Sequence, residues 1–368
     1  MVKRYLRCWL LTISGALLVA CAATGPVEPR VPPATAASDS AAAPAPDTDV
    51  RIAAVGDIML GGRTAGLLHR LGHQYPFAQT KPQLIAADLT VGNLETALTT
   101  RGEPYVDKKY LFRNPPEKVA EALYTAGFDI VSLANNHSMD YGVVGLQDTM
   151  AVLDQWGVRY HGAGLDNSQA REPEIFTLAN GQTVGFLAYS NTFPKEFWAT
   201  PTTPGTAFGH KAHIQADVAA LLDQDVDIIV VSFHWGQERK TELRAYQPEL
   251  AYAAIDAGAD LVIGHHPHIL QAVERYQEGL ILYSLGNFTF STYSNHVSSS
   301  ALAEIEFSAG KFRELRLTPL NINNFDVQLQ PQILQGAAAQ AVFEELDRLS
   351  RVRNTHLKFI DNQIILGN

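Results

Sequence analysis

The stretch Arg51-Ile52-Ala53-Ala54-Val55-Gly56-Asp57 is a short apolar run that breaks at a glycine followed by an aspartate. Four later segments repeat this pattern, because each is an apolar run followed directly by polar or metal-binding side chains. They are residues 88–91 before Gly92-Asn93, residues 129–133 before Ala134-Asn135-Asn136-His137, residues 226–233 before His234-Trp235-Gly236, and residues 259–263 before Gly264-His265-His266. Runs of this length that end at turn residues indicate buried strands.

Helical patterns lie between these runs, for example at residues 116–126 and 248–257, and Gly258 stands where a C-terminal cap would. Strand, helix and strand repeated in this way indicate an α/β fold with right-handed crossovers. Later segments predict strands without helices between them: residues 174–178, 183–189, 279–284, 301–307 and 313–317. We therefore expect a mixed sheet or a second sheet, and then a peripheral helix over residues 337–351.

The composition describes a globular protein of 368 residues, with 46% hydrophobic and 18% charged residues. Lys and Arg number 28 and Asp and Glu 38, which gives a net charge of −10. An acidic chain without a basic stripe is not expected to bind nucleic acid, because phosphate contacts need clustered Lys and Arg. Cys8 and Cys21 are the only two cysteines, which excludes a Cys-rich zinc site and a disulfide framework.

The N-terminus predicts an export signal. A basic segment is followed by a mostly apolar one, residues 9–20, of signal-peptide length. This segment closes with Leu18-Val19-Ala20-Cys21, which resembles a bacterial lipobox, so Cys21 is the expected site of lipid attachment. An ordinary signal peptide or an uncleaved anchor is the alternative. Ala22 stands where a signal for inner-membrane retention would place Asp, which favours the outer membrane of a bacterial cell envelope.

The sequence divides into four parts. Residues 1–20 are the expected lipoprotein signal peptide, and residues 21–49 are rich in Ala and Pro and predict a disordered tether. Residues 50–320 form the expected single main domain, and residues 321–368 an extension packed on it. A tether of this kind would hold a folded domain away from the membrane to which its N-terminus is anchored.

Polar side chains at the ends of parallel strands converge on one crevice in α/β sheets, which is where ligands bind. The candidates there are two carboxylates, an amide and three imidazoles: Asp57, Glu95, Asn136, His234, His266 and His268. This mixed set of oxygen and nitrogen ligands suits a pair of divalent transition metals (Mn, Fe or Zn) better than Mg or Ca. Taken singly, Asp57 is also explained as a turn or cap residue, and His234 as a core histidine.

Several strings resemble motifs of the CapA family, the poly-γ-glutamate capsule biosynthesis proteins. They are Val55-Gly56-Asp57-Ile58-Met59-Leu60, Asn93-Leu94-Glu95-Thr96, Ser132-Leu133-Ala134-Asn135-Asn136-His137-Ser138-Met139-Asp140-Tyr141-Gly142, His234-Trp235-Gly236-Gln237-Glu238, Gly264-His265-His266-Pro267-His268 and Tyr283-Ser284-Leu285-Gly286-Asn287-Phe288. The resemblance covers residues 51–290. That family is related to calcineurin-like metallophosphoesterases, which implies an αββα sandwich of mixed sheets with a dinuclear metal site.

The resemblance also implies roles for single residues. Asp57 is similar to the first metal ligand of that family and Glu95 to the bridging carboxylate. Asn136 is implied as a ligand, His234 and His266 as ligands of one metal, and His268 of the other. One departure is Met59, because the phosphoesterases have histidine at that position.

The adjacent His137 is expected to act as an acid or transition-state stabiliser without binding metal. Asp140 either orients its ring or caps the following helix. Further residues are expected to contact substrate or to support the ligands: Asn93, Asn135, His265, Asn287 and Arg113. Lys108 and Lys109 are candidate cations for an anionic polymer, although a solvated surface run explains them equally well.

The resemblance therefore implies a cell-envelope lipoprotein of the CapA type. It would act in biosynthesis or processing of a capsule made of poly-γ-glutamate or another anionic exopolymer, through a hydrolase-like site. The alternatives are a metallophosphoesterase of unknown substrate and a non-catalytic component of capsule assembly or export. The expected partners are the polymer, the membrane through the N-terminal lipid, and other capsule synthesis proteins.

Replacing Cys21 with serine tests the lipid anchor. The Cys21→Ser chain should leave the membrane fraction or remain unprocessed, because serine offers no thiol for the lipid. Cell fractionation and the mass of the processed chain measure this, with Cys8→Ser as the matched control. Unchanged processing together with unchanged membrane association would contradict the lipobox interpretation.

Overall fold

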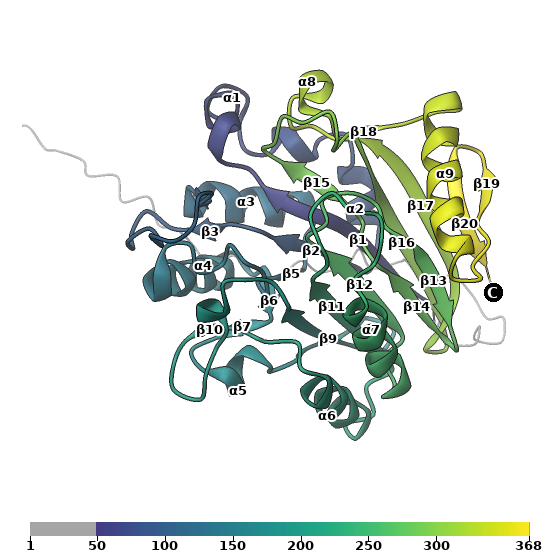
Figure 1. Ribbon diagram of the computed structural model, residues 1–368, viewed down its shortest axis with the longest axis horizontal. Coiled ribbons are helices and arrows are strands. Elements are labelled where there is room, and N and C mark those ends of the chain that lie inside the picture. Colours follow the sequence, from purple (N-terminus) through teal and green to yellow (C-terminus); the bar gives the residue numbers. More distant parts are fainter. Residues whose placement is uncertain (1–48, 368) are drawn as a thin grey trace, which may run out of the picture. The chain divides into compact units, whose positions relative to one another are not determined.

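The computed structural model describes residues 49–367, which Figure 1 shows in colour. The predicted signal peptide, Cys21 and the tether up to residue 48 lie outside the described residues. Among residues 49–367, every helix is too short or too polar to cross a membrane.

The larger of two main sheets contains ten strands within residues 49–367 and is mixed. Its parallel part consists of β15 (Asn287–Phe290), β1 (Asp49–Met59), β2 (Leu89–Leu94), β5 (Ile130–Ser132) and β6 (Arg159–His161). The edge of β1 opposite β2 pairs with β15 at its carboxyl end and with β16 (Ser299–Ser308) at its amino end. From β16 outward the strands are antiparallel: β17 (Lys311–Asn321), β18 (Gln332–Ile333), β20 (Gln363–Gly367) and β19 (Lys358–Ile360). The C-terminal residues thus extend this sheet.

The second sheet contains six strands within the same residues and is also mixed. Its parallel centre consists of β9 (Thr183–Ser190), β11 (Ile228–His234), β12 (Leu261–His265) and β14 (Gly279–Leu282). Its antiparallel edges are β8 (Glu174–Thr177) and β13 (Val273–Tyr276). Two small ribbons join loops: β3 (Ala97–Leu98) with β4 (Arg113–Asn114), and β7 (Ala163–Gly164) with β10 (Gly205–Thr206).

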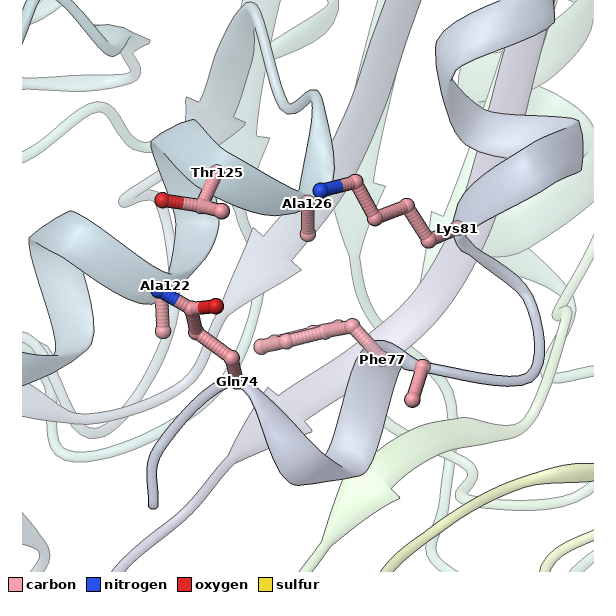
Figure 2. A pocket seen from close by; sticks show the side chains of 7 residues that line it. Gln74, Phe77, Lys81, Ala122, Thr125 and Ala126 are labelled. Carbon is pink, nitrogen blue, oxygen red and sulfur yellow. The ribbon is translucent and has the colours of Figure 1, made fainter.

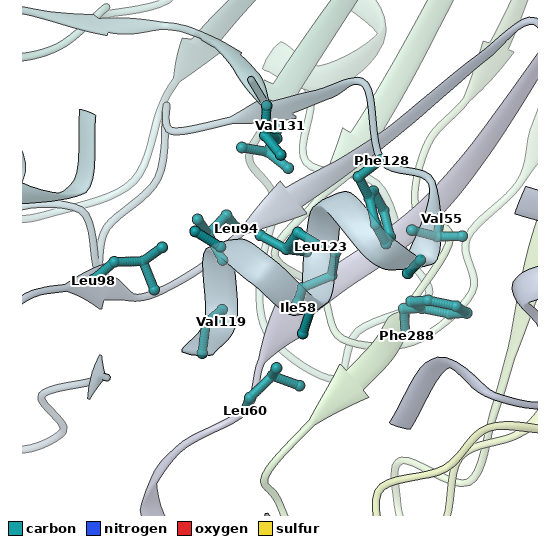
Figure 3. Packing of buried hydrophobic residues seen from close by; sticks show 14 of the residues in the cluster. Val55, Ile58, Leu60, Leu94, Leu98, Val119, Leu123, Phe128, Val131 and Phe288 are labelled. Carbon is teal, nitrogen blue, oxygen red and sulfur yellow. The ribbon is translucent and has the colours of Figure 1, made fainter. Parts of the chain in front are cut away.

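Three apolar clusters show how the layers are stacked. One cluster joins the larger sheet to α3 (Pro116–Ala126) and α4 (Gly142–Trp156); Figure 3 shows Leu123 of α3 packed among side chains of β1, β2 and β15. A second cluster, including Ile52 and Val230, fills the space between the two sheets. A third joins the second sheet to α6 (Lys211–Leu222) and α7 (Tyr246–Asp256). The predicted αββα sandwich of mixed sheets is therefore confirmed.

The remaining helices are short or peripheral. They are α1 (Ala65–Leu71), α2 (Lys81–Ala86), α5 (Asn167–Ala170), α8 (Asn324–Val327), α9 (Gly336–Arg351), and the 3-10 turns η1 (Gly62–Thr64), η2 (Tyr75–Phe77) and η3 (Lys195–Phe197). The predicted helix at residues 116–126 has the bounds of α3, and the one at 337–351 begins one residue earlier, as α9. The predicted helix at 248–257 begins at Tyr246 and ends at Asp256 as α7, with Gly258 at a φ of 115° just beyond it.

Two strands continue past the glycines that were predicted to end them. β1 runs through Gly56 to Met59 and β2 runs through Gly92 to Leu94. The physical reason is that β15 pairs with the far end of β1, from Asp57 onward, so that the backbone beyond Gly56 still has a ladder partner. Asp57 and Asn93 therefore lie on strands, where their positions are more firmly fixed than in a loop.

Gly56 is required by the close approach of two backbones. The Asp57 N–H donates a 3.0 Å hydrogen bond to the Gly286 carbonyl, which draws β15 against β1. A Cβ added at Gly56 would lie 1.8 Å from that same carbonyl oxygen. Because the obstacle is backbone, it cannot move aside as a side chain would.

The Gly56→Ala variant should therefore lower the free energy of unfolding by about 1–3 kcal/mol, the usual cost of overpacking. Gly66→Ala is the matched control, since Gly66 lies in α1 with open space at its Cβ position. Removing a helical glycine should raise stability by up to about 1 kcal/mol. Thermal unfolding followed by circular dichroism measures both, and equal melting temperatures would contradict the close-approach argument.

Candidate metal centre

The predicted ligands come together where both sheets end. In the larger sheet Asp57 lies near the end of β1, and Glu95 directly follows β2. His234 is the last residue of β11, and His266 and His268 follow β12 in the second sheet. Because these strands run parallel within their sheets, their carboxyl ends share one edge, and the side chains meet there.

Asn93 forms hydrogen bonds that connect the side chains at this edge of the sheets. Its amide Nδ2 donates to Asp57 Oδ1 at 2.8 Å and lies 3.3 Å from His234 Nδ1. Its Oδ1 accepts a 3.0 Å hydrogen bond from Asn135, whose own Oδ1 accepts the His137 backbone N–H. One buried amide network thus fixes side chains from β1, β2, β11 and the turn after β5.

Two groups of potential ligand atoms form at this edge, and both include Glu95. Asp57, Glu95 and His234 make the first group, and Glu95, His266 and His268 make the second. Within each group the atoms lie within 4.8 Å of one another. The sequence resemblance implied that His266 would join His234, whereas here it groups with His268. Asn136 lies beside the first group, with its Oδ1 2.8 Å from His234 Nε2.

The two carboxylates differ in their electrostatic surroundings although both are fully buried. Burial alone would raise the pKa of Asp57, but the adjacent imidazoles of His265 and His268 outweigh it and hold that pKa well below its usual value. Burial raises the pKa of Glu95 well above its usual value, and the charge of Asp57 adds to this effect. His268 favours the ionised form of Glu95, but its effect does not outweigh burial.

The three imidazoles also divide into two kinds. Burial lowers the pKa of His234 well below its usual value and that of His266 to about 3, so both are neutral, as metal ligands must be. Burial also acts against charge on His268, but the carboxylates of Glu95 and Asp57 outweigh it and raise the pKa to about 9. This ring is therefore protonated without metal, and a cation bound by it would displace that proton. The ring of His268 lies between them, with Nδ1 3.0 Å from Asp57 Oδ2 and Nε2 3.9 Å from Glu95 Oε1.

The chemistry of these residues fits divalent cations. Among the described residues, both oxygens of Glu95 and Nδ1 of His266 are buried without a hydrogen-bond partner. A buried carboxylate without donors is costly unless a cation compensates it. The mixed oxygen and nitrogen donors match Mn, Fe or Zn better than ions that prefer oxygen alone.

The backbone between His266 and His268 is held in an uncommon conformation. His266 has a φ of 95° and His268 a φ of 60°, in the left-handed region that side-chain-bearing residues rarely adopt. Each such residue costs on the order of 1–3 kcal/mol and persists where the surroundings over-determine it. Here the turn directs both imidazoles toward Glu95.

His137 and Asp140 form a pair beside the cluster. His137 Nδ1 lies 2.6 Å from Asp140 Oδ2, and its Nε2 lies 3.8 Å from Glu95 Oε1. Burial lowers the pKa of His137 to about 4 although Asp140 favours the charged form. The expectation that Asp140 orients this ring agrees with the geometry, while the role of His137 in a reaction stays a prediction.

The supporting residues take different places. Asn287 Oδ1 lies 2.8 Å from His268 Nδ1, so it orients that ring. His265 is buried with Nδ1 3.5 Å from Asp57 Oδ1. Arg113, expected near substrate, is exposed, and its guanidinium lies 4.6 Å from the centroid of the Tyr141 ring.

Lys108 lies at the site, and the sequence did not distinguish it from its neighbour Lys109. Its ammonium lies 2.5 Å from Asp140 Oδ1 and 3.1 Å from His137 Nδ1, and it also bonds the Asn136 carbonyl. The sequence showed two adjacent lysines in a loop without periodicity, so nothing marked the first of them as the buried one. Phe112, stacked on His137 at 4.1 Å between ring centroids, was missed for the same reason.

A hollow of about 110 Å³ lies elsewhere, in the helical layer outside the larger sheet (Figure 2). Residues of η2, α2 and α3 line it, and Lys81 is its single charged side chain. This lining offers no carboxylate or imidazole, so the hollow is not part of the metal centre.

Comparison with known proteins gives the family of this chain. Residues 51–292 match the family model described as bacterial capsule synthesis protein PGA_cap. The chain belongs to this capsule synthesis family. The match begins within β1 and ends just after β15, so it contains every residue of the two ligand groups.

Two Bacillus members of the capsule synthesis family are similar in sequence. The capsule biosynthesis protein CapA of Bacillus anthracis is 33% identical over 73% of this chain and 66% of its own length. The PGA biosynthesis protein CapA of Bacillus subtilis is 33% identical over 73% of this chain and 70% of its own. The alignments thus span about two thirds of each relative.

Solved structures overlap the chain only loosely. The NAD nucleotidase of Haemophilus influenzae has a TM-score of 0.43 at 13% identity, covering 82% of this chain and 62% of its own. A protein of Thermus thermophilus has a TM-score of 0.42 at 12% identity, covering 71% of this chain and 100% of its own. Overlaps of this size carry no information about chemistry.

Glu95→Gln should reduce the metal content at both groups, because Glu95 is the ligand they share. Glutamine keeps the size of the side chain but removes the charge. Glu249→Gln is the matched control, since Glu249 is exposed on α7 and its replacement makes the same change in net charge. Elemental analysis after dialysis against Mn²⁺ or Zn²⁺ measures the stoichiometry, with one to two ions expected in the unmodified chain. Full metal content in Glu95→Gln would contradict the inference that Glu95 is a ligand in both groups.

Proposed function

We propose that this chain acts at the bacterial cell envelope in the synthesis or processing of a capsule polymer, and that its metal centre works as a hydrolase-like site on an anionic polymer such as poly-γ-glutamate. Membership of the capsule synthesis family supports the biological role. The observation that carries the chemical part is the pair of ligand groups sharing Glu95 at one buried edge.

The residues divide the work between binding and proton transfer. Asp57, Glu95 and His234 would hold one divalent ion, and Glu95, His266 and His268 the other. Bound there, two such ions supply Lewis acidity for a scissile carbonyl or phosphoryl group and lower the pKa of water. Asn93 and Asn287 keep the ligand side chains oriented through the hydrogen bonds described above.

His137 is the residue proposed to exchange a proton with the reacting groups. Its Nδ1 is held by Asp140, so Nε2 is the atom directed toward the ligand cluster. Phe112 covers one face of the ring and keeps it in that orientation. General acid–base catalysis by such a group contributes typically about 10²–10⁴-fold.

The envelope location rests on the sequence. Lipid on Cys21 would anchor the chain at the membrane. The acidic net charge of −10 disfavours binding of a polyanion by the surface as a whole. Binding of an anionic polymer is therefore proposed at the metal centre itself, where cations would concentrate positive charge.

His137→Ala tests the proposed proton transfer. Metal content and melting temperature should stay near those of the unmodified chain, while turnover falls about 10²–10⁴-fold. Turnover is measured on γ-linked glutamate oligomers and, in parallel, on a chromogenic phosphodiester, with Mn²⁺ or Zn²⁺ present. His69→Ala, which removes an exposed histidine of α1, is the matched control.

The outcomes separate the alternatives. Loss of metal together with activity would make His137 a ligand, and full activity would make it a bystander. Hydrolysis of the phosphodiester alone would identify a phosphoesterase. A metal-loaded chain that turns over neither substrate but binds the polymer would favour an assembly role.

A further inference from the structure

One loop closes over the His137–Asp140 pair from outside the sheet. It runs between β3 and β4, and its backbone is joined to the turn after β5 at two points. The Tyr105 N–H donates to the Asp140 carbonyl at 2.9 Å, and the Phe112 N–H donates to Asp140 Oδ2 at 2.6 Å. Lys108 lies between these two points and turns its side chain inward.

The Lys108 side chain is largely enclosed. It is 14% exposed, and its partner Asp140 is 0% exposed. The ammonium contacts Asp140 Oδ1, His137 Nδ1 and the Asn136 carbonyl, and it lies 5.4 Å from the centroid of the Phe197 ring. Lys108 thus joins the β3–β4 loop, the turn after β5 and the 3-10 turn η3.

Charge and hydrogen-bond capacity fix how this cluster is arranged. Asp140 receives the Phe112 N–H and the Lys108 ammonium, so its carboxylate is a buried acceptor that requires a counter-charge. An ammonium has only donors, so Lys108 cannot accept the proton of His137. The ionised Asp140 carboxylate has only acceptors, so the short contact from His137 Nδ1 to Asp140 Oδ2 is made by an Nδ1–H donor, and the 3.1 Å approach of Lys108 to Nδ1 is a contact without a hydrogen bond.

The position of Lys108 decides what it can do. It meets His137 at Nδ1, whereas Nε2, on the other side of the ring, is the atom 3.8 Å from Glu95. Lys108 therefore lies behind the imidazole as seen from the metal centre. Its direct contacts are with Asp140, His137 and the Asn136 carbonyl, so its effect on the reaction passes through these groups.

We propose that Lys108 is a positioning residue: its ammonium balances the buried Asp140 carboxylate, and this ion pair, with Phe112, keeps His137 Nε2 directed at the metal centre. The consequence for turnover rests on the function proposed for His137. The structural part, the orientation of the imidazole, does not depend on it. Lys109, the neighbouring lysine, is exposed and lies over the Tyr110 ring instead.

The test compares Lys108→Met with Lys109→Met in the full chain loaded with Zn²⁺. Histidine labelled with ¹⁵N gives imidazole signals that report which ring nitrogen carries the proton, and His137→Ala identifies those of His137. We expect Lys108→Met to shift the His137 signals and Lys109→Met to leave them unchanged, with the zinc content equal in both. Lys108→Arg, which keeps the charge, should restore the signals at least in part.

Turnover gives the second readout. Lys108→Met should lower kcat about 10–100-fold, the usual effect of losing a residue that orients a functional group, with KM unchanged. A chain without measurable turnover would refute the proposed function, while the imidazole signals would still decide the role of Lys108. If Lys108→Met does not fold, Lys108→Gln replaces it and the same shift is required. Unchanged His137 signals in a folded variant without the Lys108 charge would overturn the proposal.

Discussion

The candidate site depends on burying two carboxylates, Asp57 and Glu95, at the edge where the two sheets end. A buried carboxylate is stable only when charge or hydrogen bonds compensate it. Asp57 has that compensation from Asn93 and two histidines, whereas among the described residues the Glu95 oxygens have no hydrogen-bond partner. The difference makes Glu95 the position at which a cation would stabilise the fold most, and the shared member of both ligand groups is this same residue.

The layered fold explains why these charges can be held so closely. Side chains along each strand alternate between the space separating the sheets and the helical layers, so every second residue of β11 and β12 points inward. Ile228 and Val230 of β11 fill the apolar core, and the same face continues through Ser232 to His234. The inter-sheet core thus changes from apolar to polar along one strand, which places the His234 imidazole at the end of a buried strand.

Local patterns in the sequence predicted much of this arrangement. The helix at residues 116–126 could be predicted to the residue because Pro116 and Gly127 mark its ends. The ligand positions followed from apolar runs that end in polar side chains. The path of the β3–β4 loop could not be predicted, since it has no period and its contacts are with residues about 30 positions away. The sequence therefore could not show that Lys108 turns inward while Arg113 is exposed.

The continuation of β1 past Gly56 shows a second limit of sequence reasoning. A glycine before a polar residue normally indicates a turn, but here it permits β15, about 230 positions later in the chain, to pass within hydrogen-bond distance. The same crossing brings Asn287 against His268. The left-handed conformations of His266 and His268 are then held against their intrinsic strain, because the turn that contains them is bonded to Asp57 on one side and Asn287 on the other. The strained turn and the close approach of β15 to β1 at Gly56 therefore depend on each other. Together they hold the ligand side chains in place without a bound metal.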